Sequence, residues 1–536
     1  MAAKAVLASG PFPVTHQPIE KITVSNHTLG SIFLLGFALR VLLMFVAGNN
    51  GGDAFVRYEI GVTWLHNPWH LPSLVYLPLH PILNGLAYAV WPSEMGPRFF
   101  TVVLGSLTVL LFGGIAQRLF SPLVTVFSTL MFALFGFHIA YSMTTSAEVP
   151  TLFFLALGMY GWVRYVKEDR SAWLWVVLLG FGCAAWCKLE AWVFMAPLAV
   201  FTLDWSGGLK SAIHNKKRWR MAALFGIAST AGAISLMSLA YVWWHDPIAF
   251  AHRSFAIGNQ LPGFLRQSPL YSSMAHPGAL FMTLSPVVML LSVLGITLLF
   301  RERGWLWKVP GALAVFSLAV WTYMTIYHST TMARYTLLYS WLLIPYAFTA
   351  IEWLSKGSVR RARDWMMIVI ATAVLWQGAT LAGAYYAPAA IANKLSSVAI
   401  TLPMRPDIRA VAAWMHANVN SGEYLAADNF NEEAADVVRL CGLDRSQAMI
   451  LPWLTPSERG GDADQRLRSF VIRQHPSFLI YSPKGRLHAL WGMHDETDFE
   501  VAGLGVSLHR VFANGNYRVY RMSYGPTDLR LSSMLR

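Results

Sequence analysis

The chain has 536 residues, of which 55% are hydrophobic and only 13% are charged. Soluble globular proteins carry about 25% charged residues, so this composition indicates an integral membrane protein. The formal net charge of +13 comes from basic clusters between apolar segments, which is typical of membrane topology. We expect no nucleic-acid partner.

Residues 1–29 lack the continuous apolar core of a cleavable signal. We expect this segment to be a polar tail on the cytoplasmic side. The cysteines predict no disulfide framework, because Cys183 and Cys187 lie one helical turn apart in an apolar segment and Cys441 stands alone.

A membrane-spanning helix needs about 20 mainly apolar residues. Residues 30–387 hold eleven such segments, with the short pair around Cys187 to Asp204 as the weakest, since an alternative count merges them. The predicted spans are 30–47, 97–118, 122–141, 148–166, 171–187, 190–204, 221–244, 278–300, 310–327, 335–353 and 365–387.

The basic residues test this count, because Lys and Arg favour the cytoplasmic side. With the N-terminus inside and eleven spans, every strong basic cluster falls in an inside loop. These clusters are Arg164, Lys167 and Arg170; Lys210, Lys216, Lys217, Arg218 and Arg220; Arg301, Arg303 and Lys308; and Lys356, Arg360, Arg361 and Arg363.

Two outer loops are long, at residues 48–97 and 245–277. The first contains VYLPLHPILNGLAYAVWP, which is too short and too rich in proline to span and predicts an amphipathic helix in the membrane interface. The second mixes aromatic, proline and basic residues and predicts short helices beside the membrane.

From residue 390 to residue 536 the hydrophobic runs shorten to globular length. Helices are predicted at 409–419, 432–441 and in DQRLRSFVIRQHP, strands at 423–427, 448–451 and in SFLIYSP, and a hairpin around Asn514-Gly515. The sequence therefore predicts a soluble extracytoplasmic α/β domain after the membrane-spanning part.

The predicted topology places two acids, Asp53 and Glu148, on the outer face, with three cations at outer helix ends, namely Arg98, Lys188 and Arg334. An acid at this depth is costly unless it binds or reacts with something, although Asp53 could also be a solvated loop residue. Cations at helix ends often only extend toward water. Together, however, these groups could bind an anionic headgroup and activate a hydroxyl beside it.

The order of motifs resembles the GT-C membrane glycosyltransferases, which include the protein O-mannosyltransferases (glycosyltransferase family 39) and the aminoarabinose transferases. The matching motifs are Arg40 followed by GDAFVRY with Asp53 and Tyr58, the proline-rich YLPLHPILNGLAYAVW, PRFFTVVLG with Arg98, YSMTTSAEVP with Glu148, CKLEAW with Lys188, and ARYTLLYSW with Arg334 and Tyr335. The resemblance covers roughly residues 30–355.

The resemblance implies a polytopic GT-C fold and an inverting transfer of sugar from a polyprenyl phosphate carrier to an extracytoplasmic acceptor hydroxyl. Asp53 would be the general base, with Glu148 as a second catalytic carboxylate. Arg57, Tyr58, Arg98, Lys188, Arg334 and Tyr335 would bind the lipid phosphate or the sugar. The donor, an undecaprenyl or dolichyl phosphate sugar, and the bilayer are the expected partners, and a bacterial cytoplasmic membrane is the expected location.

One departure from the family concerns metal binding. The family commonly has a second acid directly after the first, and here Ala54 stands in that place. The outer histidines match no ligand spacing such as HExxH. We therefore assign no metal ligands, and a divalent metal stays an open alternative.

Two other functions stay open. A transporter or flippase of lipids or sugar-lipids would place charges near span midpoints, and Arg40 is one such charge. A non-catalytic lipid-binding protein of the same fold is the other alternative. The identities of the sugar and of the acceptor, whether protein, lipid or glycan, are not specified by these motifs.

Overall fold

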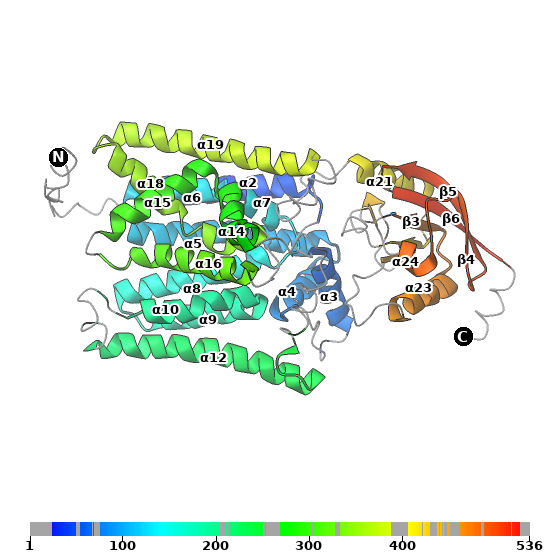
Figure 1. The fold of residues 1–536 in the computed structure, drawn as a ribbon, viewed down its shortest axis with the longest axis horizontal. Coiled ribbons are helices and arrows are strands. Elements are labelled where there is room, and N and C mark those ends of the chain that lie inside the picture. Colours follow the sequence, from blue (N-terminus) through cyan, green and yellow to red (C-terminus); the bar gives the residue numbers. More distant parts are fainter. Residues whose placement is uncertain are drawn as a thin grey trace.

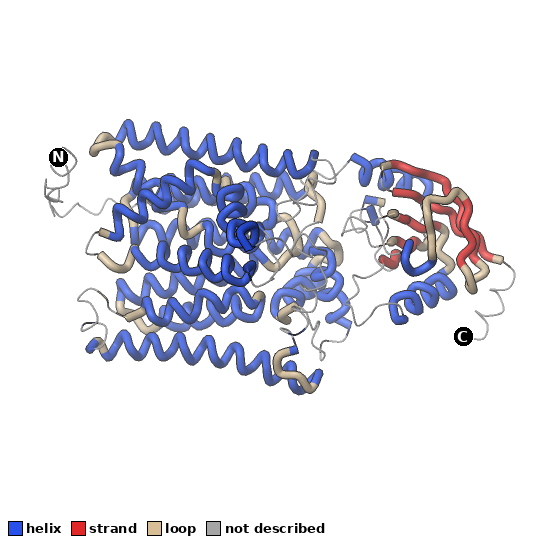
Figure 2. Tube along the Cα trace, viewed as in Figure 1, coloured by secondary structure: helices blue, strands red, loops and turns tan. Residues whose placement is uncertain are grey.

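The computed structural model describes most of the chain. The described residues are 24–49, 54–66, 68, 76–203, 205, 211, 214–249, 252, 269–301, 304–326, 333–386, 406–420, 422–428, 437, 438, 440, 441, 443, 447–450, 461–483, 487–515 and 517–525. They form a helical bundle followed by a smaller part that contains both helices and strands (Figures 1 and 2).

The bundle is built from helices in the order of the predicted spans. They are α2 (Asn26–Met44), α5 (Met95–Leu119), α6 (Pro122–Ala133), α7 (Gly136–Ser142), α8 (Glu148–Glu168), α9 (Ala172–Cys187), η1 (Leu189–Ala191), α10 (Trp192–Phe201), α12 (Lys216–Trp244), α14 (Pro269–Leu284), α15 (Pro286–Phe300), α16 (Lys308–Ile326), η3 (Ala333–Thr336), α17 (Leu337–Ser340), α18 (Ile344–Leu354) and α19 (Val359–Tyr386).

All eleven predicted spans are helical over most of their described length. Within the described residues, five helices are long and apolar enough to cross a membrane, and eight spans result if each of three bent helix pairs counts as one. The shorter apolar segments in α9, α10 and α12 supply the other three predicted spans. That these three also cross the membrane stays a prediction.

The predicted span 278–300 is not one straight helix. It is broken between α14 and α15, which meet at an angle of 106°. Ser285 at the break has φ of 82° and its hydroxyl accepts the Val288 N–H, while Pro286 opens α15. Proline has no N–H to donate and favours the first turn of a helix, so a new helix begins at Pro286. That this bent pair crosses the membrane as one span stays a prediction, and the apolar composition of the segment does not report the break.

Long-range contacts divide the loops between the two ends of the bundle. Lys167 and Arg218 donate to the carbonyls of Arg118 and Val166, respectively, and Ser121 donates to Glu352. These residues define the basic end. Glu148 lies at the other end of α8 and contacts Lys188 and Arg334, which define the site end. The described residues that these contacts join therefore lie at two separate ends of the bundle.

Two further helices lie at the site end, α3 (Ala54–His66) and α4 (Leu79–Val90). They cross so closely that a Cβ atom on Gly61 would lie 2.5 Å from the Pro81 carbonyl oxygen. Figure 1 shows them at the end of the bundle that faces the strands. The predicted helix in the first outer loop is thus present as α4, and α3 packs against it.

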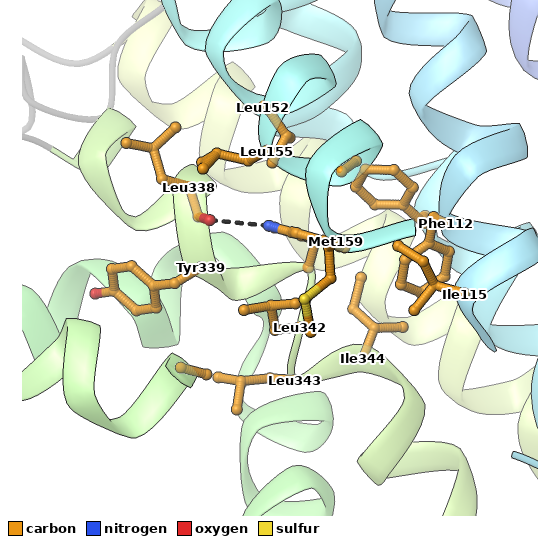
Figure 3. Packing of buried hydrophobic residues seen from close by; sticks show 14 of the residues in the cluster. Phe112, Ile115, Leu152, Leu155, Met159, Leu338, Tyr339, Leu342, Leu343 and Ile344 are labelled. Carbon is orange, nitrogen blue, oxygen red and sulfur yellow. Dashed lines mark hydrogen bonds between the residues drawn. The ribbon is translucent and has the colours of Figure 1, made fainter. Parts of the chain in front are cut away.

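The bundle core is apolar and rich in aromatic side chains. Phe112 stacks at a tilt on Phe132 with ring centroids 4.8 Å apart, and Trp341 donates from Nε1 to the Leu338 carbonyl at 2.8 Å. Figure 3 shows this bond among the side chains of α5, α8 and α17, including Met159. Internal pairing of the indole N–H is what burial in an apolar core requires. This packing holds the ends of α8 and α17 in fixed positions.

The C-terminal part contains one mixed sheet in the order β2-β1-β3-β6-β5-β4. Its strands are β1 (Leu425–Ala427), β2 (Ala448–Ile450), β3 (Phe478–Tyr481), β4 (Asp498–Val501), β5 (Val506–Asn514) and β6 (Tyr517–Tyr524), and its helices are α21 (Pro406–Asn418), α23 (Gly461–Gln474) and α24 (Leu487–Trp491). The predicted helices, strands and β5–β6 hairpin are present, except that most of the helix predicted at 432–441 lies outside the described residues.

Candidate functional site

Glu148 is the first residue of α8 and is fully buried. Its Oε1 atom lies 2.9 Å from Lys188 Nζ and 3.5 Å from Arg334 Nε. Its Oε2 atom has no hydrogen-bond partner among the described residues. A carboxylate in the first turn of a helix is also stabilised by the helix dipole. The fold therefore unites an acid and two cations that are far apart in the sequence.

Lys188 lies in the turn between α9 and η1 and is buried. Its second carboxylate partner is Glu190, with Nζ and Oε1 3.1 Å apart. Burial opposes the charged form of Lys188, but the two carboxylates outweigh burial and the net effect is a raised pKa. Lys188 therefore stays charged at neutral pH.

Tyr335 forms one wall of this cluster. Lys188 Nζ lies 4.6 Å from the Tyr335 ring centroid, and Arg334 Cζ lies 5.5 Å from it. The ring stacks on Trp321 of α16 at 5.1 Å, with an interplanar angle of 10°. Cations over an aromatic face are attracted to it, so the stack fixes the positions of the two cationic side chains.

Arg57 on α3 is a third buried cation near the cluster. Its guanidinium lies 4.1 Å from the centroid of the Tyr76 ring, and its charge acts on Glu148. Its Nε and Nη1 atoms have no hydrogen-bond partner within the described part of the chain. A buried guanidinium with open donors is costly, and an anion would satisfy it.

His80 on α4 is buried and lies within electrostatic range of Arg57, Glu148 and Lys188, although the sequence does not distinguish it from the other outer histidines. Asn84 Nδ2 donates to the Thr145 carbonyl at 3.2 Å, which fixes its amide orientation, and it lies 3.3 Å from His80 Nε2. His80 Nε2 is therefore an acceptor and Nδ1 carries the proton. Burial, followed by the charge of Arg57, keeps the His80 pKa well below its usual value. In the sequence, only the position of Asn84, four residues after His80, could have suggested that His80 Nδ1 carries the proton.

Asp53, the predicted base, lies outside the described residues. The described residues on either side of segment 50–53 both contact Thr145, which precedes Glu148 by three positions. Asn49 Oδ1 accepts the Thr145 N–H at 2.8 Å, and the Ala54 carbonyl accepts the Thr145 hydroxyl at 2.6 Å. Asn49 and Ala54, which flank this glycine-rich segment, are thus both held against the loop that leads to Glu148.

Arg98 has a different set of partners from Lys188 and Arg334. It is fully buried and donates to the carbonyls of Met143, Met44 and Ala47 at 2.7, 2.9 and 2.8 Å. These carbonyls belong to the ends of α7 and α2, where backbone acceptors lack partners within the helix. Tyr58 is also buried and packs edge-on against Tyr88 of α4 at 6.0 Å. In the structure both residues hold elements together beside the site.

Arg40, the charge nearest a span midpoint, has local partners. Its guanidinium donates to the carbonyls of Gly36 and Ala133 and lies 2.9 Å from His138 Nδ1. The Ala133 carbonyl is at the 49° bend between α6 and α7. Arg40 therefore satisfies a backbone acceptor that the bend leaves free.

Within the described residues, no group of three or more His, Cys, Asp and Glu side chains could hold a metal ion. The acids and cations at the site end instead form a cluster that we call the cation cluster, made of Arg57, Lys188 and Arg334 with Glu148 and Glu190. Three positive and two negative charges leave one positive charge. Such a cluster suits a singly charged phosphodiester.

Comparison with known proteins agrees with this architecture. A family profile described as dolichyl-phosphate-mannose-protein mannosyltransferase matches residues 84–205. Curated protein sequences give no match.

Among solved structures, apo ArnT from Cupriavidus metallidurans aligns over 92% of this chain and 98% of that chain, with a TM-score of 0.58 and 14% identity. ArnT from the same organism bound to undecaprenyl phosphate aligns over 91% and 97%, with a TM-score of 0.54 and 14% identity. An apo oligosaccharyltransferase from Archaeoglobus fulgidus aligns over 87% and 70%, with a TM-score of 0.49 and 11% identity.

Proposed function

Because the chain has the GT-C fold that it shares with ArnT, we propose that it is a membrane glycosyltransferase. It transfers a sugar from a polyprenyl phosphate carrier to an acceptor hydroxyl, with inversion at the anomeric carbon. The observation that carries this proposal is the cation cluster, in which Lys188 and Arg334 contact the buried Glu148 and the charge of the buried Arg57 acts on the same carboxylate. Lipid could lie against the apolar helices while its phosphate reaches this cluster.

In the proposed reaction the acceptor oxygen attacks the anomeric carbon as the bond from that carbon to the phosphate oxygen breaks. The hydroxyl proton passes to a carboxylate, which we assign to Asp53, and the leaving group departs as polyprenyl phosphate. A positioned base of this kind contributes roughly 10²–10⁴-fold to the rate. Glu148 is the second carboxylate of the site.

Arg57, Lys188 and Arg334 hold the phosphate in this proposal. The leaving monoester carries about −1.5 to −2 charges near neutral pH, compared with one on the donor. Cations that are already in place stabilise the charge that grows during departure. Tyr335 and the His80 Nδ1–H lie beside the phosphate in this proposal. We assign Arg98 and Tyr58 the role of holding the site elements in position, because Arg98 donates to backbone carbonyls and Tyr58 packs against Tyr88.

The proposed topology has the N-terminus and the basic end in the cytoplasm and the C-terminal α/β part outside, in a bacterial cytoplasmic membrane. The acceptor, whether protein, lipid or glycan, would reach the site end from the outer water phase. The transporter alternative loses its main support, because the donors of Arg40 are directed to backbone carbonyls and His138. A charge used in this way is a structural one.

The test is a turnover assay with purified protein and a panel of polyprenyl phosphate sugars. Wild-type protein should release sugar from at least one donor, and Asp53→Asn should reduce turnover by 10²-fold or more, roughly the contribution of a positioned base. Glu168→Gln, at the basic end, is the matched control and should keep wild-type activity.

Equal turnover by wild type and Asp53→Asn would refute the base assignment. A wild-type protein that is inactive on every donor, with and without added Mg²⁺ or Mn²⁺, would refute the enzyme assignment and favour the non-catalytic alternative.

A further inference from the structure

Glu148 occupies the point at which the cations of the cluster meet. Lys188 and Arg334 both approach the same carboxylate oxygen, Oε1. We propose that Glu148 is a resident counter-ion that competes with the donor phosphate for these two cations, so that donor binding frees this carboxylate. This inference rests on the proposed function, because it takes a polyprenyl phosphate as the ligand of the cluster.

The donors of Lys188 show why competition is expected. An ammonium group has three N–H donors. Two of the neighbours of Nζ are the carboxylates of Glu148 at 2.9 Å and Glu190 at 3.1 Å, and the third is the Tyr335 ring at 4.6 Å. A phosphate can gain a strong bond from Lys188 only by replacing one of these carboxylates.

Arg57 offers the point of first contact. Its Nε and Nη1 atoms are buried and have no hydrogen-bond partner in the described part of the chain, so a phosphate oxygen can bind there without displacing a protein group. Guanidinium groups bind phosphate through paired donors. Lys188 and Arg334 then transfer from Glu148 to the phosphate, which brings the second and third cations into the site.

Burial makes Glu148 necessary in the resting protein. Glu148 and Lys188 side chains are 0% and 6% exposed, and uncompensated buried charges are strongly unfavourable. The carboxylate offsets the repulsion between the cations until phosphate arrives. After transfer, its return to Lys188 helps to displace the polyprenyl phosphate product, which has gained negative charge.

A simpler alternative makes the opposite prediction. If Glu148 only orders Lys188 and Arg334 for phosphate, neutralising it releases both side chains and weakens phosphate binding. If Glu148 competes, neutralising it strengthens binding. The sign of the change in affinity therefore distinguishes the two.

The experiment measures the Kd of undecaprenyl phosphate for the full chain in lipid nanodiscs by microscale thermophoresis. Glu148→Gln keeps the shape of the side chain and removes its charge. A unit charge at ion-pair distance corresponds to roughly fivefold in affinity in water and roughly a thousandfold at the effective dielectric constant of a protein site, so we expect the variant to bind undecaprenyl phosphate at least about tenfold more tightly while its turnover falls.

Glu168→Gln is the matched control. Glu168 also accepts ion pairs, from Arg164 and Arg118, but at the opposite end of α8, so its neutralisation should leave the Kd unchanged. Glu148→Asp is a second test variant, because it keeps the charge but withdraws the carboxylate from Lys188 and Arg334. Its affinity should lie between those of wild type and Glu148→Gln.

Unchanged or weaker binding by monodisperse Glu148→Gln would overturn the inference. If that variant does not fold, an affinity of Glu148→Asp equal to or below that of wild type would overturn it. Wild-type protein that binds neither undecaprenyl phosphate nor dolichyl phosphate would instead refute the proposed function. Tight wild-type binding with no gain in the variants would leave the proposed function standing and remove only the competition.

Discussion

Two arginines with similar sequence settings have different surroundings in the fold. Arg98 and Arg334 both stand near the outer end of a predicted span. Arg98 donates to three backbone carbonyls, whereas Arg334 pairs with Glu148 next to Lys188. A guanidinium that satisfies free carbonyls at helix ends stabilises the fold. One that faces a carboxylate beside other cations is available for exchange with a ligand.

We therefore predict that Arg98→Met destabilises the protein by about 3 kcal/mol or more, because it removes a buried charge and leaves several buried carbonyls unpaired. Arg334→Met should lower stability less and raise the KM for the donor more. The measurements are thermal unfolding of the purified proteins and steady-state kinetics on each. If the Arg98→Met protein is folded and stable and has lost only donor affinity, Arg98 would instead belong to the residues that bind the phosphate.

Pairs of helices position the site residues. α3 supplies Arg57 and α4 supplies His80, and the two helices approach closely where Gly61 meets Pro81 and Gly85. Because this crossing leaves no room for a side chain, it fixes how Arg57 and His80 lie relative to each other. The break between α14 and α15 acts similarly, because it lets α14 pack against α16 and η3, which carry Trp321 and Tyr335.

Gly61→Ala should separate α3 from α4, since the new Cβ would lie 2.5 Å from a backbone oxygen. We expect lower thermal stability and at least a tenfold loss of kcat/KM, a loss equivalent to about 1.4 kcal/mol. Gly182→Ala on α9 is the matched control, because a Cβ there meets nothing within 4 Å. It should be neutral or stabilising by up to about 1 kcal/mol through helix propensity. Equal effects of Gly61→Ala and Gly182→Ala on thermal stability and kcat/KM would contradict a tight crossing of α3 and α4.

At the scale of the whole molecule, contacts separate the bundle into a basic end and a site end. Arg118, Arg164 and Glu168 are joined at the first, and Glu148, Lys188 and Arg334 at the second. Lys and Arg favour the cytoplasmic side of a membrane. The asymmetry therefore predicts that the site end, with α3 and α4, faces the outside.

Labelling with a membrane-impermeant maleimide checks this orientation in intact cells. His252→Cys, at an exposed position on the predicted outer side, should react without permeabilisation, and Lys356→Cys, at the exposed turn after α18, should react only after it. Cys183, Cys187 and Cys441 are first replaced by Ser or Ala, and the cysteine-free protein is the background control. Reaction of both sites from the same side would contradict an odd number of spans between them and the proposed topology.

The sequence alone predicted much of the architecture because hydropathy and residue periodicity are local properties. The order of the helices, the helix at α4 and the β5–β6 hairpin all follow from short windows of sequence, whereas the sidedness of the basic loops stays a prediction. The break at Ser285 was missed, since the apolar run continues through it. The position of His80 beside the site was not predicted, because its neutral state and the proton on Nδ1 depend on Asn84, Thr145 and Arg57 together.

By itself the sequence determined that this is a polytopic membrane protein, because burial in lipid requires long apolar helices, and from the charge bias it predicted that a set of acids and cations lies on one side of the membrane. Only the tertiary structure decided which of these charges meet. Glu148, Lys188 and Arg334 come from three distant helix ends, and Arg98, which looked equivalent, is used to hold helix ends together. Ion pairs depend on distances of a few ångströms between elements far apart in the chain, and no local pattern contains that information.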